Sequence, residues 1–176
     1  MHRLWVETET LEMSNARLSK ENAVHLRVLR PKDGEEFELF DGCGALRIFR
    51  WDARAAQLTA RGGTVTHKRS GASIALFACV TKGQRWDWTI QKATELGTAR
   101  IIPVISERTI VRITPGEGSA KRERWQKIAE DAARQSDAIW VPEIHEPISF
   151  RDALALAAKT ICFAGALTNP PSPPLL

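Results

Sequence analysis

The apolar pattern of this chain changes at about residue 73, and this change constrains the fold more than any other feature. Before it, short apolar-polar alternations are separated by turn residues, a pattern typical of small sheets. Residues 73–80 then form a continuous apolar run, as expected for a parallel strand buried on both faces. Helical spacing follows at Trp86, Ile90 and Ala93, before Gly97. The sequence therefore predicts a β-rich unit followed by an α/β unit.

The β-rich unit is expected to contain a hairpin. Apolar residues alternate with glutamates over residues 36–39, residues 41–44 supply Asp and Gly for a turn, and alternation resumes over residues 46–49. Residues 57–60 and 63–66 predict two further short strands joined by a glycine-containing turn. Strands at such close spacing favour a small barrel or a curled sheet.

Strands and helices alternate through the second unit. Residues 100–105 predict the next strand, and an apolar stripe predicts a helix over about residues 121–135. A strand over 141–145, a helix over 150–158 and a strand over 160–165 follow. This order indicates an α/β domain with a mostly parallel sheet. The prolines after residue 169 rule out a helix behind the last predicted strand.

Composition narrows the classes of protein. The hydrophobic and charged fractions, 43% and 26%, are those of a folded globular chain, and the longest apolar runs are far shorter than the ~18 residues that span a bilayer. Without an apolar signal region at the N-terminus, a cytoplasmic location is expected and a membrane partner is not. The net charge of +4 permits a nucleic-acid partner without requiring one.

The cysteines and histidines predict no metal site. Cys43, Cys79 and Cys162 form no C-x-x-C pair, so neither a zinc ribbon nor a disulfide framework is expected. We predict that the three thiols are reduced and buried as small hydrophobic groups. The four histidines are scattered without ligand spacing.

Two polar clusters follow predicted strands of the α/β unit. The segment TKGQR, residues 81–85, leads from the apolar strand into a helix, where Gly83 would let backbone amides approach a phosphate. It is neither a Walker loop nor a G-x-G-x-x-G loop, and a solvated turn explains it equally well. Arg108 follows the next strand and could clamp a phosphate, although a surface ion pair with Glu107 is the simpler interpretation.

Two further features have simpler explanations than function. The segment KRER, residues 121–124, and Lys127 make a basic helical face that we interpret as solvated. Glu95 is expected to face water or to pair with Lys92. No Ser-His-Asp or Cys-His arrangement follows from the spacing.

Taken together, these segments resemble one family. KGQRWDWTIQKATELG, residues 82–97, resembles the K-G-x-[KR]-x-[DE]-x-x-[IV]-[QE]-K-x-[TV]-E-L-G segment of RsmE-type ribosomal RNA methyltransferases, and IIPVISER, residues 101–108, follows at the family's distance. ERWQKIAEDAARQS, residues 123–136, resembles the helix of the family that ends in E-A-x-x-Q-[SC]. Where the family has Gly-Arg after this helix, the chain has Asp137 and Ala138. The resemblance covers nearly the whole chain.

The resemblance implies a fold and an activity. Residues 1–70 would form a PUA-like β-barrel that binds RNA, and residues 71–176 a SPOUT α/β methyltransferase domain, whose knotted C-terminal chain binds S-adenosylmethionine in the family. Family members are homodimers that methylate ring nitrogen 3 of a uridine in 16S ribosomal RNA. The expected partners are therefore 16S ribosomal RNA or the small ribosomal subunit, and a second copy of the chain.

The resemblance also assigns site residues, although no catalytic residue. The residues expected to contact RNA are Arg3, Arg30, Lys82, Arg85 and Arg108. The residues expected to line the cofactor pocket are Gly165, Ala166 and Leu167. Glu95 and Gln135 are expected to be structural, or to support residues of the site without acting as catalysts.

The family's G-P-E-G-G loop and final L-G-x-x-I-L-R-x-E-T-A segment have no counterpart before Leu176. The expectation is therefore a C-terminally truncated family member with an incomplete SPOUT domain. Two activities stay open: methyl transfer, or RNA binding by a non-catalytic remnant. An unrelated nucleotide-binding α/β protein is a third alternative, which titration with ATP or NAD would expose.

Overall fold

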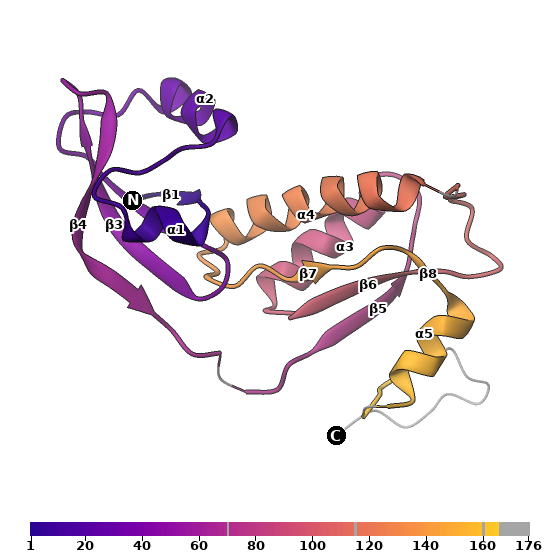
Figure 1. Cartoon of the computed structure of the whole chain (residues 1–176). Coiled ribbons are helices and arrows are strands. Elements are labelled where there is room, and N and C mark those ends of the chain that lie inside the picture. Colours follow the sequence, from indigo (N-terminus) through magenta and orange to yellow (C-terminus); the bar gives the residue numbers. More distant parts are fainter. Residues whose placement is uncertain (70, 115, 160, 166–176) are drawn as a thin grey trace.

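A computed structural model describes residues 1–69, 71–114, 116–159 and 161–165, and it has two separate sheets. Figure 1 shows them at opposite ends of an elongated molecule, with the N-terminal sheet on the left. The predicted order, a β-rich unit followed by an α/β unit, is confirmed.

The first sheet contains β1 (His2–Trp5), β2 (Glu36–Phe40), β3 (Ala45–Asp52) and β4 (Gln57–Thr66), hydrogen-bonded in that order. β1 runs parallel to β2, and the other pairs are antiparallel. Inward side chains of successive strands meet in one core, since alternate residues of a strand point to the same face. Its completely buried members are Leu4, Leu11, Phe37, Leu39, Phe49 and Leu58.

The predicted hairpin is confirmed, but the prediction of two strands at 57–60 and 63–66 is wrong. β4 is one ten-residue strand that continues through both glycines. The irregularity lies in its pairing with β3, where the register shifts between Leu46 and Ile48, and Arg47 donates from Nε to the Gly62 carbonyl at 3.0 Å. A bulge thus replaces the expected turn.

Two helices accompany the first sheet. α1 (Thr8–Glu12) is a short helix, and α2 (Lys20–Leu29) has an N-cap at Ser19, whose Oγ accepts a hydrogen bond from the Asn22 amide at 3.1 Å. α2 ends at Arg30, which adopts a left-handed conformation with φ of 50°.

The second sheet is parallel throughout, as predicted. β5 (Ala75–Cys79) pairs with β6 (Arg100–Ile105), and β6 pairs with β7 (Glu143–Ile144) and β8 (Ile148–Ser149). β7 lies along the first half of β6 and β8 along the second half, so they are two parts of one interrupted strand. Gln126 holds the first part by accepting from the Ile144 amide and donating to the Pro142 carbonyl.

Three helices belong to this unit: α3 (Gln84–Glu95), α4 (Glu117–Gln135) and α5 (Phe150–Ala157). Figure 1 shows α3 and α4 on one side of the sheet and α5 apart from them, near the end of the described chain. Trp86 of α3 and Trp125 of α4 meet edge to face with ring centroids 5.5 Å apart. Both side chains are buried, so these tryptophans belong to the core of the second unit.

Three predictions for this unit are wrong. β5 is half-exposed instead of buried on both faces, because α3 and α4 cover one face only, and Ile74 just before it is 60% exposed. The described residues 161–165 form no strand, and Ile161 and Phe163 are exposed. Cys79 and Cys162 are exposed instead of buried, as is Cys43 in the first unit.

Neither a membrane span nor a metal cluster is found in the described part of the chain. No helix there combines the length and the apolar character needed to cross a bilayer. No group of three or more His, Cys, Asp or Glu side chains within it could hold a metal ion.

Candidate functional site

The two predicted polar clusters lie at one edge of the second sheet. β5 and β6 are parallel, so the loops that follow Cys79 and Ile105 leave the sheet at the same end. In α/β sheets, ligands bind in the crevice outside this carboxyl edge. A cavity of about 580 Å³ lies there, and it is lined by Lys82, Gly83, Trp86, Ile110, Lys121 and Trp125 among others.

The loop from β5 into α3 owes its shape to a glycine. Gly83 precedes α3 with φ of 67° and ψ of −144°, a conformation that side chains with a Cβ rarely adopt. The amides of the first turn of a helix lack partners within the helix and favour anions. Lys82 and Arg85 flank this turn and are exposed.

The loop after β6 is held by its own side chains. Ser106 and Thr109 form a closed turn, in which the Ser106 amide donates to Thr109 Oγ1 at 2.9 Å and the Thr109 amide donates to the Ser106 carbonyl at 3.0 Å. At the far end of the loop, the Thr114 amide donates to Glu117 at 2.9 Å. Hydrogen bonds from Thr114 lower the pKa of Glu117, so this carboxylate stays charged in place.

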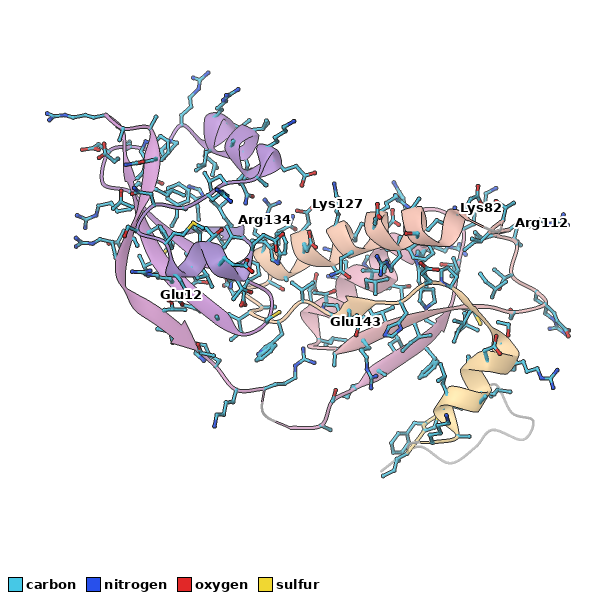
Figure 2. All side chains as sticks on the ribbon, viewed as in Figure 1. Glu12, Lys82, Arg112, Lys127, Arg134 and Glu143 are labelled. Carbon is cyan, nitrogen blue, oxygen red and sulfur yellow. The ribbon has the colours of Figure 1, made fainter. Side chains whose placement is uncertain are left out.

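Four cations at this edge lack an acidic partner. Lys82, Arg85, Arg108 and Arg112 are exposed, and none of them forms a salt bridge to any residue that the structure describes. Figure 2 shows Lys82 and Arg112 close to the start of α4, at the end of the molecule far from the first sheet. Of the four, Lys82 lines the cavity. Cations without an acidic partner can bind phosphate groups without first breaking an ion pair.

The basic face of α4 differs from this edge. Arg124 reaches Asp87 of α3 at 2.6 Å, and Lys127 reaches Glu21 of α2 at 2.8 Å. Two of its cations therefore connect α4 to other helices, where simple solvation was predicted. Glu95 pairs with Lys92 at 2.7 Å, as expected.

The structure brings together only some of the predicted site residues. Lys82, Arg85 and Arg108 lie at the same edge of the second sheet. Arg30 is exposed at the end of α2 in the N-terminal unit. Arg3 is buried, and its guanidinium bonds to groups within the chain.

Of the three residues assigned to the cofactor pocket, Gly165 is exposed and has no atoms within 4 Å of the position of a Cβ. Ala166 and Leu167 lie outside the described residues. Sequence reasoning overlooked Arg112, although its place in the loop after β6 was a sufficient signal.

A larger groove, of about 1050 Å³, lies between α2 and α4. Its lining mixes cations such as Lys20, Arg122 and Arg134 with carboxylates such as Glu123 and Glu143. This balance of charge suits a polyanion less well than the cationic edge does.

Glu130 in this groove should make stability depend on pH. Its pKa is raised from 4.5 to about 7, first by burial and then by Asp131, Glu21 and Glu7, while Lys127 acts in the opposite direction. A pKa above the unfolded value means that its stabilising contribution is complete below pH 4.5 and is lost as the pH rises through 7. Relative to wild type, Glu130→Gln should therefore gain about 1 kcal/mol across this range, allowing for partial solvent screening. Urea unfolding at several pH values measures the difference, and a constant difference would contradict it.

Comparisons with known proteins agree on one family. A family model described as RNA methyltransferase domain matches residues 68–169. The ribosomal RNA small subunit methyltransferase E of Synechocystis is 30% identical over 155 residues, covering 85% of this chain and 48% of that protein. The enzyme of the same name from Bacillus subtilis is 42% identical over 73 residues, or 42% of this chain and 28% of that protein. The chain thus spans about half or less of the length of these relatives.

Two solved structures share the fold. The ribosomal RNA small subunit methyltransferase E of Neisseria gonorrhoeae, bound to S-adenosyl methionine, matches with a TM-score of 0.74 and 31% identity over 88% of this chain and 64% of that chain. A putative methyltransferase of Legionella pneumophila, in complex with the same cofactor, matches with a TM-score of 0.75 and 27% identity over 87% and 65%. These matches confirm the predicted α/β fold class. The chain belongs to the RNA methyltransferase domain family, and within it to the RsmE-type ribosomal RNA methyltransferases.

Proposed function

We propose that this chain methylates ring nitrogen 3 of a uridine in 16S ribosomal RNA, with S-adenosylmethionine as the methyl donor. The observation that carries the proposal is the group of unpaired cations at the carboxyl edge of the parallel sheet in a member of this family. The names of the relatives support ribosomal RNA as the substrate, and the neighbours solved with the cofactor support the donor.

In this proposal the cations position the RNA and stabilise charge. Lys82, Arg85 and Arg108 contact phosphates or the target nucleotide, and Arg30 contacts RNA from the N-terminal unit, residues 1–70. The imide nitrogen of uridine must lose its proton as it is methylated, and a nearby guanidinium would stabilise the negative charge on the base oxygens. The uridine must also be unpaired or flipped out to expose this edge.

The cofactor supplies an electrophilic methyl group on a sulfonium. Gly165, Ala166 and Leu167 are the residues proposed to line its pocket, and of these Gly165 is exposed with no atom within 4 Å of the position of a Cβ. Calorimetric titration of S-adenosylmethionine into the folded protein should give binding in the micromolar range, whereas a folded protein without any binding would contradict this part of the proposal.

Replacing Lys82 by alanine should weaken RNA binding. Each cation that neutralises a phosphate releases counterions, so its loss should lower the slope of log K against log salt by about one unit. Fluorescence anisotropy with labelled ribosomal RNA at several salt concentrations measures the slope. Lys92→Ala is the matched control, because it removes the same charge from α3 at a residue already paired with Glu95. Equal slopes for Lys82→Ala and wild type would remove Lys82 from the RNA site.

RNA binding without methyl transfer is the second candidate. One observation favours it: Lys82, Arg85 and Arg108 are exposed and form no salt bridge to a described residue, and contacts from these cations to RNA need no methyl donor. Binding of RNA together with failure to bind S-adenosylmethionine would establish it.

A further inference from the structure

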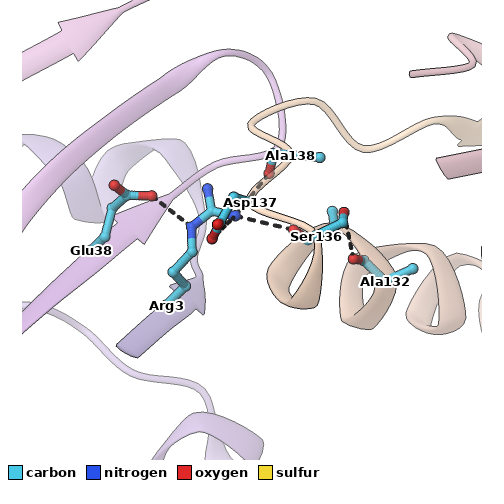
Figure 3. Close-up of polar contacts among 7 residues, drawn as sticks. Arg3, Glu38, Ala132, Ser136, Asp137 and Ala138 are labelled. Carbon is cyan, nitrogen blue, oxygen red and sulfur yellow. Dashed lines mark hydrogen bonds and ion pairs between the residues drawn. The ribbon is translucent and has the colours of Figure 1, made fainter. Parts of the chain in front are cut away.

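A buried guanidinium connects the two units of the molecule. Arg3 lies in β1, and its side chain is only 6% exposed. Its Nε donates to Glu38 Oε1 in β2 at 2.6 Å, while its Nη1 donates to the carbonyls of Ala133 and Ala138 at 3.1 and 3.2 Å. Figure 3 shows Arg3 between Glu38 and the end of α4. One side chain therefore bonds to the first sheet and to the last turn of a helix in the second unit.

The surroundings of Arg3 suit a buried cation at this point. Its guanidinium lies over the ring of Phe40, 4.4 Å from the centroid. The carbonyls at the end of α4 carry the negative end of the helix dipole, which favours a cation. The Asp137 carboxylate adds a second acidic group at 3.8 Å. Ser136 fixes this end of α4 by donating from its amide and hydroxyl to the Ala132 carbonyl.

The geometry requires arginine. A planar guanidinium donates in several directions from one plane and can bond to a carboxylate and to carbonyls at the same time, whereas the ammonium of lysine is a compact point charge. Burying a charge is costly unless it is paired, and the contacts of Nε and Nη1 offset this cost, while Nη2 is buried without a hydrogen-bond partner among the described residues. A buried cation with these partners has no exposed face to offer a phosphate.

A second contact joins the units at a different place. The turn between β2 and β3 meets the segment after α4, where the Gly44 amide donates to the Ile139 carbonyl at 3.1 Å and the Val141 amide donates to the Gly42 carbonyl at 2.8 Å. One attachment point allows two bodies to rotate about it in any direction, whereas two points leave rotation only about the line that joins them.

We propose that Arg3 is a positioning residue that fixes the N-terminal sheet against α4, so that both RNA-binding surfaces face one RNA molecule at a set angle. The role of Arg3 as a joint stands on its contacts alone, and its consequence for RNA binding rests on the proposed function. Two linked sites that bind one strand gain affinity from their effective concentration, and they lose this gain when their geometry is no longer held. Arg3 thus acts on RNA binding without contacting RNA.

The test compares Arg3→Met and Arg3→Lys with wild type, using a long oligouridylate that reaches both units and a short one that occupies a single site. Both variants should lose at least ~10-fold in affinity for the long RNA and little for the short one. The salt slope with the short RNA should stay unchanged. Hydrogen exchange of the Val141 amide, which donates across the junction, should become faster in both variants.

Arg47→Met is the matched control. Arg47 also donates to backbone carbonyls, those of Leu11, Met13 and Gly62, but all of these belong to the N-terminal unit. Arg47→Met should leave two quantities at their wild-type values: the exchange rate of the Val141 amide, and the ratio of the affinity for the long RNA to that for the short RNA. Glu38→Gln, which keeps the carbonyl contacts of Arg3, is a milder variant in case Arg3→Met does not fold.

Three outcomes would overturn the proposal. A salt slope reduced by about one unit with the short RNA would make Arg3 a phosphate ligand. The same loss of affinity for the long RNA in Arg47→Met would show a general effect of stability. Unchanged exchange of the Val141 amide in the Arg3 variants would show that Arg3 does not hold the junction. If wild type binds neither RNA, the proposed function fails, and the exchange of Val141 alone decides on the joint.

Discussion

Replacing Trp86 by alanine should lower the free energy of unfolding by about 3–5 kcal/mol, the range for a buried tryptophan. Trp86 is 2% exposed and packs edge to face on Trp125, so the change removes a large side chain from the contact between α3 and α4. Because Trp86 also lines the cavity beside Lys82, the variant should bind RNA more weakly even where it is still folded.

Trp88→Ala provides the control for this experiment. Trp88 lies two residues further along α3 and is 62% exposed, so its loss should change stability by no more than about 1 kcal/mol. Chemical denaturation followed by circular dichroism measures both variants. Equal losses for Trp86→Ala and Trp88→Ala would show that the contact between the two helices does not stabilise this unit.

Gly44→Ala should cost about 2–5 kcal/mol and should act mainly on the junction between the two units. Gly44 has φ of 100°, and a Cβ at this position would clash with Cζ2 of Trp140 and lie 2.9 Å from the His67 carbonyl. Either the backbone or the indole must move, and Trp140 is further held by Arg69, which lies over its ring at 5.0 Å. The hairpin turn should then separate from the segment after α4.

Gly62→Ala separates the clash from the backbone strain. Gly62 also has a positive φ, of 61°, but its Cβ would meet no atom within 4 Å. This variant should cost only the strain of the conformation, about 1–2 kcal/mol. Thermal unfolding and hydrogen exchange of the Val141 amide compare the two variants. Equal losses and equal exchange rates would show that the contact with Trp140 does not constrain the junction.

Local patterns predicted the elements of the second unit well. The strand expected over residues 100–105 is found with those bounds, and α3 ends before Gly97 as its spacing indicated. These elements carry strong signals because their apolar residues follow one period and their ends coincide with turn or cap residues. Parallel pairing of β5 and β6 then brought Lys82 and Arg108 to one edge, as a sequence argument can predict from strand direction alone.

The failures came from features that depend on the rest of the molecule. β5 was expected to be buried on both faces, but burial depends on which helices cover the sheet, and only one face is covered by α3 and α4. The same reason left Cys79 exposed at the end of this strand. β4 continues through Gly62 and Gly63 because its pairing with β3 shifts register at a bulge near Arg47, so the chain needs no turn there. The sequence alone does not distinguish a bulge from a turn.

Arg3 shows the limit of assigning a site from sequence. The sequence assigned Arg3 to RNA contact, whereas its side chain is 6% exposed and its partners Ala133 and Ala138 lie 130 and 135 residues away in the chain. No local sequence pattern predicts a contact between residues so far apart in the chain. Pairings over this distance arise from how two folded units dock, which periodicity and motif spacing do not encode.

The most direct test of the proposed function is transfer of a labelled methyl group from S-adenosylmethionine to 16S ribosomal RNA by the folded protein, with nucleoside analysis of the product. We expect label to enter the RNA on ring nitrogen 3 of a uridine, and we expect Lys82→Ala to reduce the rate while Lys92→Ala does not. A folded protein that binds this RNA but transfers no label would contradict it, and it would leave RNA binding without methyl transfer as the function of this chain.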